Sequence, residues 1–166
     1  MRIAVISDSH DNIPAIDRAL VYLKKEKIRM LIHCGDICAP ETLEHIAKNF
    51  TGMIHAVIGN VDADVDSLQL ISQKYSRLTI HGNVGAVEIE KRKIAFTHYP
   101  WIADTLAKQK KYDAVFYGHD HRAWEKKLGT TVVRNPGTLA GLFAKPTFAV
   151  YDTTTNLAKL ILLERI

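Results

Sequence analysis

Residues 1–36 read MRIAVISDSHDNIPAIDRALVYLKKEKIRMLIHCGD, and their pattern is the strongest indication of the fold class. A short apolar run at 2–7 precedes a helical pattern at 13–26, and a second apolar run follows at 30–34. Asn12 is a suitable N-cap for the helix, whose buried face is marked by Ile13, Ile16, Leu20 and Leu23. The order strand, helix, strand predicts a βαβ unit with parallel strands.

The rest of the chain repeats this alternation and then changes to consecutive strands. We expect further helices at residues 40–48, 67–74 and 102–110, and strands at 53–58, 77–81, 86–90, 93–97, 114–117, 123–128, 131–134, 147–152 and 157–163. This order indicates an α/β protein with two packed sheets flanked by helices. Because the chain has 166 residues and no linker, we expect 1–166 to form a single domain.

The composition is that of a globular protein, with 47% hydrophobic and 24% charged residues. No apolar run is long enough for a signal-peptide core or a membrane span, so we expect a cytoplasmic protein without membrane association. The formal charge is +4, but the basic residues are dispersed, which makes a nucleic-acid groove unexpected. Cys34 and Cys38 match neither a CxxC redox pair nor a zinc clip, so we expect reduced thiols.

Five apolar runs each lead directly into side chains that can bind a metal ion. These side chains are Asp8, His10, Asp36, Asn60, His98, His119 and His121. The carboxyl ends of strands in α/β sheets converge on one crevice, so we expect all seven to be neighbours. Each one alone has an ordinary explanation, as a turn residue or a buried histidine. Together they would be costly to desolvate without a cation, and the pattern therefore predicts a metal site.

The predicted ligands offer only nitrogen and oxygen atoms, which suit divalent cations; we expect manganese, with nickel, iron or zinc as alternatives. Seven side chains are too many for one ion that must also leave a position for substrate. They suit two ions that share one carboxylate, for which Asp36 is the candidate. Two such ions can clamp the attacking and leaving oxygens of a phosphate ester and generate a bound hydroxide as nucleophile.

The chain resembles the calcineurin-like metallophosphoesterases in an ordered set of motifs: Asp8-Ser9-His10, Gly35-Asp36, Gly59-Asn60-Val61-Asp62, His98 and Gly118-His119-Asp120-His121. The segment at 135–138, Asn-Pro-Gly-Thr, is similar to that of the small bacterial and archaeal phosphodiesterases, whose eukaryotic relative is a retromer subunit. The resemblance covers nearly the whole chain. It implies a two-sheet αββα sandwich of the metallophosphoesterase type.

The resemblance also implies how the ligands divide between the two metals. The first metal would be held by Asp8, His10, Asp36 and His121, and the second by Asp36, Asn60, His98 and His119. Asn60 and His98 would in addition be catalytic, because they lie where charge builds up in the transition state. Asp11 and Asp62 are candidates for orienting the ligands.

Two positions depart from the family pattern. Many members have a histidine after Gly-Asn that can protonate the leaving group, whereas this chain has Val61. We therefore expect hydrolysis of small phosphodiesters or of esters with good leaving groups, without strong monoesterase activity. Tyr99 replaces a common glycine, and with Trp101 it either shapes one wall of the pocket or packs in the core or at the rim.

Two other functions compete with a phosphodiesterase. The resemblance to the retromer subunit allows a protein-interaction scaffold whose metals are vestigial or structural, and related folds include nucleases. The oligomeric state stays open. The remaining histidines are expected to be structural or at the surface: His33, His45, His55 and His81.

Overall fold

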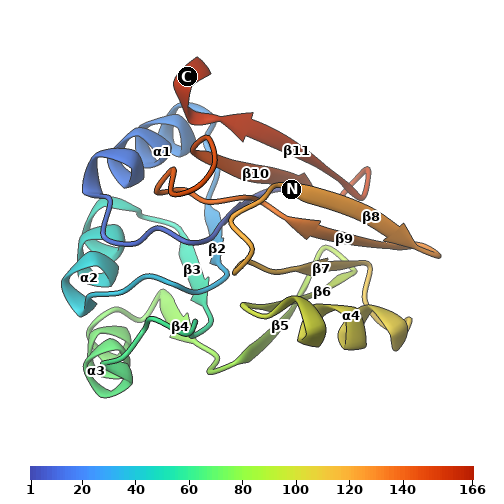
Figure 1. The fold of residues 1–166 in the computed structure, drawn as a ribbon, viewed down its shortest axis with the longest axis horizontal. Coiled ribbons are helices and arrows are strands. Elements are labelled where there is room, and N and C mark those ends of the chain that lie inside the picture. The colour runs from blue at the N-terminus through green and yellow to red at the C-terminus, as the bar shows by residue number, and fades with distance from the viewer.

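The computed structural model describes residues 1–166 and contains two β-sheets that pack against each other between layers of helices (Figure 1). The strands are β1 (Arg2–Ile6), β2 (Met30–His33), β3 (Met53–Ala56), β4 (Leu78–Ile80), β5 (Val84–Ile89), β6 (Arg92–Thr97), β7 (Ala114–Phe116), β8 (Trp124–Leu128), β9 (Thr131–Asn135), β10 (Thr147–Asp152) and β11 (Leu157–Leu162). The helices are α1 (Ile13–Lys25), α2 (Pro40–Asn49), α3 (Val65–Lys74), α4 (Pro100–Lys108) and a short 3-10 helix (Leu163–Arg165).

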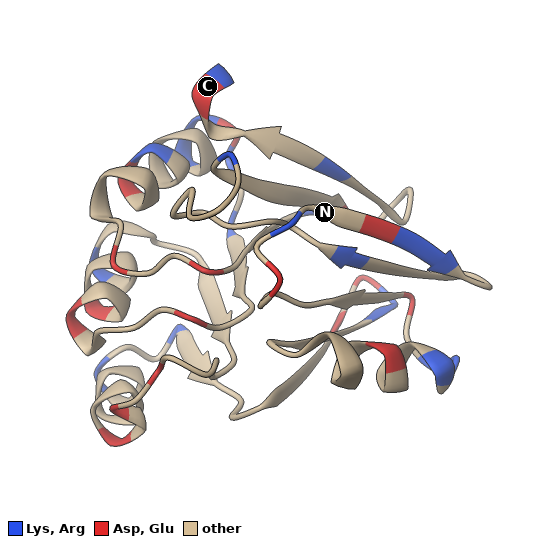
Figure 2. Cartoon of the chain, viewed as in Figure 1, with Lys and Arg blue, Asp and Glu red and all other residues tan.

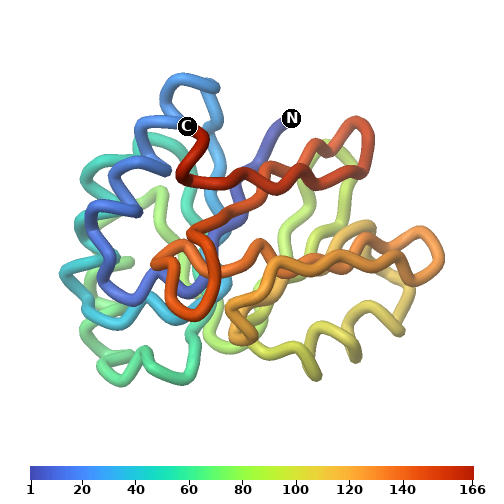
Figure 3. The backbone as a smooth tube through the Cα atoms, turned by 45° about the horizontal axis from the view of Figure 1, so that its top comes forward, coloured from blue at the N-terminus to red at the C-terminus, as the bar shows by residue number.

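The first sheet has six strands in the order β11-β10-β1-β2-β3-β4. Strands β1 to β4 run parallel, and α1, α2 and α3 connect them in turn, which confirms the predicted βαβ pattern. The C-terminal strands β10 and β11 extend the sheet antiparallel on the other side of β1. In Figure 3 these red strands return to lie beside the blue N-terminal strand. The two ends of the chain thus complete one sheet.

The second sheet has five strands in the order β5-β6-β7-β9-β8. Its three central strands β6, β7 and β9 are parallel, and the outer strands β5 and β8 are antiparallel to their neighbours. Helix α4 connects β6 to β7. The parallel strands of both sheets therefore end in loops that can carry functional side chains.

Successive side chains along a strand point to opposite faces of the sheet, and these faces contact different layers. In β1, Ala4 and Ile6 pack against the helices, whereas Ile3 and Val5 face the second sheet. A third apolar cluster joins α4 to the outer face of the second sheet. Burial of each Ile or Val side chain contributes about 1.5–3 kcal/mol, so both faces of β1 are strongly anchored. The order of layers confirms the expected αββα sandwich.

Two helices begin earlier than the sequence pattern predicted. Helix α3 begins at Val65 because Asp64 caps it, accepting a hydrogen bond from Ser67 N at 3.0 Å. Helix α4 begins at Pro100, where proline is tolerated since the first helical N–H has no partner within the helix. Asn12 caps α1 as predicted, with Ala15 N 3.1 Å from its Oδ1. None of the helices has the length and apolar character needed to cross a membrane.

The four histidines expected to be structural or at the surface have local partners. Buried His33 lies 2.9 Å from Ser9 Oγ through its Nε2 atom. His45 pairs with the Asp17 carboxylate at 2.6 Å, at the surface. The rings of His55 and His81 contact each other, with 3.0 Å between their nitrogens. These placements agree with the roles that the sequence predicted.

Burial of His33 makes stability depend on pH. Burial lowers the pKa of His33 from 6.5 to about 3, and the nearby His98 and His10 rings act in the same direction. Below about pH 6.5 the unfolded chain therefore binds a proton that the folded chain excludes. The free energy of unfolding decreases as the pH is lowered from about 6.5 toward 3. We predict that His33→Gln reduces this loss by up to about 1.4 kcal/mol per pH unit.

Urea titrations of chelated protein between pH 6.5 and 4 check this prediction. If the free energies of unfolding of variant and wild type ran parallel across the window, His33 would not be the group responsible.

Candidate metal centre

The centre lies where the chain leaves the carboxyl ends of five strands. Strands β1, β2, β3, β6 and β7 are followed, in this order, by Asp8 and His10, Asp36, Asn60, His98, and His119 and His121. Short contacts between side chains link all seven of these residues into one network. The structure thus brings together every ligand that the sequence predicted.

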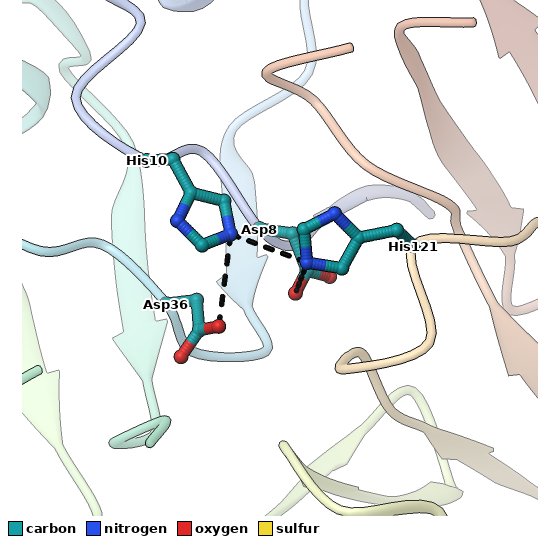
Figure 4. Close-up of side chains that lie close together, drawn as sticks. All are labelled: Asp8, His10, Asp36 and His121. Carbon is teal, nitrogen blue, oxygen red and sulfur yellow. Dashed lines mark hydrogen bonds and ion pairs between the residues drawn. The ribbon is translucent and has the colours of Figure 1, made fainter. Parts of the chain in front are cut away.

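The first part of the network is a cluster of two carboxylates and two imidazoles (Figure 4). Asp8, His10, Asp36 and His121 each offer one ligand atom, and these four atoms lie within 4.8 Å of one another. His10 Nε2 is 3.3 Å from His121 Nε2 and 3.7 Å from Asp36 Oδ2. His121 Nε2 is in turn 3.3 Å from Asp8 Oδ1. We call these four residues the first cluster.

A second group of ligand atoms adjoins the first cluster. Asn60 Oδ1 lies 2.9 Å from His98 Nε2 and 2.8 Å from His119 Nδ1. The two histidine nitrogens are 3.2 Å apart, and His98 Nε2 is 3.3 Å from Asp36 Oδ1. We call Asp36, Asn60, His98 and His119 the second cluster.

Asp36 belongs to both clusters. Its Oδ2 faces His10 and its Oδ1 faces His98, and the residue is only 2% exposed. The backbone N–H of Val61 also donates to Oδ1, at 3.2 Å. This is the geometry expected of a carboxylate that two cations could share.

Hydrogen bonds to backbone carbonyls fix the ring protons of two histidines. His98 Nδ1 lies 2.8 Å from the Cys34 oxygen, and His121 Nδ1 lies 3.3 Å from the Leu142 oxygen. A carbonyl can only accept, so these Nδ1 atoms carry the protons and the Nε2 atoms present lone pairs. Both Nε2 atoms point at carboxylate oxygens, which are also acceptors in their ionised form. The histidine nitrogens and the carboxylate oxygens thus face each other with no proton between them. A cation bound between them would satisfy both sets of lone pairs.

The buried Asp8 carboxylate also lacks a positively charged partner. It is fully buried, and its Oδ2 makes no hydrogen bond. Burial raises the pKa of Asp8 to about 7; the nearby Ser7 hydroxyl offsets part of this shift, and the Asp36 carboxylate adds to it. A divalent cation would hold this carboxylate ionised.

Buried His98 and half-buried His10 are suited to metal binding in the same way. Burial lowers the pKa values of His98 and His10, and the attraction of Asp36 offsets only part of the shift. Neutral imidazole is the form that coordinates a metal. The nitrogen and oxygen donors, their close approach and the unpaired Asp8 oxygen therefore fit divalent metal ions.

The candidate ligands lie on backbone conformations that non-glycine residues adopt infrequently. Five of them have positive φ angles: Asp8 (53°), His10 (40°), Asp36 (57°), His119 (75°) and His121 (56°). Aspartate and histidine tolerate this left-handed region better than most residues. Such conformations persist only where the surroundings impose them, and they gather at functional sites.

Asp62 holds two of the ligand loops together. Its carboxylate accepts hydrogen bonds from the backbone N–H groups of Asp36 (3.0 Å), Ile37 (2.7 Å), Cys38 (2.7 Å) and Gly59 (2.7 Å). The bonds connect the loop that carries Asp36 to the loop that carries Asn60. Asp11 plays a similar part for the start of α2, accepting from Ala39 N at 3.0 Å and from Thr42 Oγ1 at 2.5 Å. The two candidates for orienting the ligands thus act on the backbone of the loops.

Glycine is required at two places where loops meet. A Cβ atom on Gly59 would lie 2.1 Å from Asp36 Oδ1. A Cβ atom on Gly118 would lie 1.9 Å from Ser7 Oγ and 2.8 Å from Asp8 Oδ2. The glycines in the Gly-Asn and Gly-His motifs therefore make room for the carboxylates.

Sequence reasoning missed three residues that support the centre. Asn135 Nδ2 donates to the Gly118 oxygen at 2.9 Å, and Thr138 Oγ1 donates to the Asp8 oxygen at 3.1 Å. The Asn-Pro-Gly-Thr segment was a signal for these two, although its role was not apparent. The Leu142 carbonyl, which orients His121, had no sequence signal because any residue supplies a carbonyl.

Neither cysteine is a nucleophile. Cys38 Sγ lies 3.5 Å from His10 Nδ1, but burial and four surrounding aspartates raise the pKa of its thiol to about 12. Burial also raises the pKa of Cys34 well above its usual range. These shifts favour the thiol form of both side chains, and a thiol is a far weaker nucleophile than a thiolate.

We predict that Asp62→Asn weakens the affinity for Mn²⁺ about 10- to 100-fold, because the amide cannot accept all four backbone hydrogen bonds. Titration calorimetry on chelated protein measures the effect. The matched control is Asp64→Asn, since Asp64 only caps α3. Equal affinities of Asp62→Asn and wild type would show that Asp62 does not position the loops.

The chain is similar to known phosphoesterases in sequence and in structure. Residues 1–156 match the model of the calcineurin-like phosphoesterase superfamily domain. The chain is 30% identical over 167 residues to phosphodiesterase MJ0936 of Methanocaldococcus jannaschii, covering 99% of this chain and 100% of the relative. A solved structure described as a novel archaeal phosphodiesterase superposes with a TM-score of 0.90 at 28% identity, covering 98% of this chain and 99% of that one.

Vps29 of Entamoeba histolytica shares the fold alone, with a TM-score of 0.69 at 18% identity and coverage of 98% and 99% of the two chains. The resemblance seen in the motifs is thus confirmed along almost the entire sequence. The family match and the first cluster together support a metal-dependent phosphoesterase. The chain belongs to the calcineurin-like phosphoesterase superfamily.

Proposed function

We propose that this chain is a hydrolase that cleaves small phosphodiesters with the help of two divalent metal ions. Membership of the family and the likeness to MJ0936, which is named a phosphodiesterase, support the reaction class. The observation that carries the two-metal proposal is the position of Asp36, whose two oxygens face His10 and His98 separately.

The two clusters divide the metal ligands between them. The first cluster would hold one ion and the second cluster the other, with Asp36 shared. Manganese suits these nitrogen and oxygen donors, and nickel, iron and zinc are alternatives. When bound, such ions supply positive charge for the transition state and lower the pKa of the water molecule that attacks phosphorus.

Asn60 and His98 are the proposed catalytic residues. The His98 ring proton is committed to the Cys34 oxygen, so His98 keeps its bare nitrogen directed at the centre. Asn60 turns Oδ1 toward His98 and His119, which leaves its exposed NH₂ group to donate to a phosphoryl oxygen. That hydrogen bond would strengthen as negative charge builds up in the transition state.

Val61 supports a preference for diesters. Its side chain is 40% exposed next to Asn60, at the position where many family members have histidine. An isopropyl group has no proton to give, so the leaving group must depart without help from this position. Esters with good leaving groups meet that condition, and alkyl monoesters do not.

The alternatives have less support. All seven ligand positions carry side chains able to bind metal, which favours an enzyme over an interaction scaffold with vestigial metals. A nuclease would need a basic groove for its polymeric substrate. Figure 2 instead shows Lys and Arg spread over the helices and outer strands, which fits a small substrate better.

We predict that Asp36→Ala lowers the hydrolysis of bis(p-nitrophenyl) phosphate by at least about 1000-fold, or ~4 kcal/mol, because both clusters lose a ligand. The assay uses chelated protein recharged with Mn²⁺, and metal content is measured in parallel. Asp120→Asn is the control, since exposed Asp120 lies between two ligands in sequence. An Asp36→Ala protein that kept activity and two bound ions would rule out the shared carboxylate.

We predict that Val61→His raises kcat/KM for phenyl phosphate, a monoester with a poor leaving group, about 10- to 100-fold by supplying the missing acid. The hydrolysis of bis(p-nitrophenyl) phosphate should change little, because p-nitrophenolate leaves without a proton. Val61→Asn adds a polar group of similar size that does not titrate, and it should keep the wild-type preference. Equal turnover of the diester and the monoester by wild type would contradict the role given to Val61.

A further inference from the structure

A stacked pair of aromatic rings, one half-buried and one exposed, borders the second cluster. The rings of Tyr99 and Trp101 stack, with centroids 4.8 Å apart and planes inclined by 29°. The Trp101 ring lies 5.6 Å from the His119 ring, and the Tyr99 ring lies 5.1 Å from the His98 ring. We call Tyr99 and Trp101 the aromatic pair. It contacts the two histidines of the second cluster.

Core packing does not explain Trp101. Helix α4 is anchored to the second sheet by Ala103, Leu106 and Ala107, all buried. Trp101, in the first turn of the same helix, is 59% exposed. A large ring held in contact with water beside a polar site is a surface on which a planar group can stack.

The aromatic pair is also held in place, which a stacking surface requires. Tyr99 supports one side of the indole, and the His119 ring meets it at 85°. Phe143, which lies 5.4 Å from His121, differs in this respect because it is 96% exposed and contacts no other ring. Trp101 is therefore the better-ordered platform.

We propose that Trp101 stacks on a planar aromatic group in one arm of the substrate, so that the substrate class is a small phosphodiester bearing a nucleobase or aryl group. The inference rests on the proposed function, since it assumes that the phosphoryl group lies at the two clusters. From there, an ester arm next to His119 would reach the Trp101 ring, because the two rings lie 5.6 Å apart. Base stacking on an aromatic side chain typically strengthens binding about 10-fold or more.

The charges around the centre favour a small ligand over a strand of nucleic acid. A strand of nucleic acid would need basic side chains along the path of its successive phosphates. Figure 2 shows Lys and Arg dispersed over the helices and outer strands instead. A substrate with one phosphodiester group and one planar ring could bind the metal ions through its phosphate and stack on the aromatic pair through its ring.

The test compares two probes that differ only in the base. Binding of AMP and of ribose 5-phosphate to Mn²⁺-loaded protein is measured by titration calorimetry. We expect wild type to bind AMP about 10-fold more tightly, which corresponds to ~1.4 kcal/mol. Trp101→Ala should abolish this preference, and Trp101→Phe should keep part of it because a ring remains.

Trp124→Ala is the matched control. Trp124 is as exposed as Trp101, at 60%, but lies on the edge strand β8 and contacts no ring of the centre. The preference for AMP should survive in this variant. Equal binding of the two probes by wild type, or an unchanged preference in Trp101→Ala, would overturn the stacking role.

Hydrolysis of bis(p-nitrophenyl) phosphate by the same preparations separates the two proposals. Activity without a preference for AMP would overturn the stacking inference and leave the proposed function standing. A preference for AMP that depends on Trp101, in protein that cleaves no diester, would support the stacking inference and overturn the proposed function.

Discussion

The crowding of unprotonated lone pairs around Asp36 is the constraint on which the rest of this site depends. One carboxylate oxygen faces His10 and the other faces His98, whose ring proton is already donated to a backbone carbonyl. Nearby, Asp8 is buried with an oxygen that no donor reaches. Acceptors packed so closely repel one another unless a cation lies between them, and so the surrounding fold must hold them against that repulsion.

The fold supplies that restraint through the loops. Left-handed backbone at several ligands turns the chain sharply enough to aim side chains inward, and Gly59 and Gly118 let neighbouring loops touch. Asp62 then joins two loops through four backbone hydrogen bonds, and Asn135 and Thr138 secure two more. Beneath them, strands buried on both faces keep the loop ends from moving apart. Strained conformations of this kind persist only on so rigid a base.

In our proposal, selectivity comes from residues beside the candidate ligands. Val61 has no proton to give to the leaving group, whereas Trp101 presents an exposed ring next to His119. In this proposal Val61 limits which ester bonds can break, and Trp101 selects the substituent that binds beside the centre. The ligands themselves say little about either, because the same donors could serve many phosphate esters.

The sequence alone was enough to predict the order of strands and helices, the αββα class and the seven candidate ligands that the fold brings together. Hydrophobic periodicity and strand-end motifs are local patterns, so they can be recognised in the sequence without a structure. Even so, the start of α4 was misplaced because Pro100 reads equally as a loop residue. Only the tertiary structure decided that Asp36 faces both clusters, that Asp62 binds four backbone N–H groups, and that the Leu142 carbonyl orients His121. These contacts join segments distant along the chain, and no local pattern encodes the distance between them.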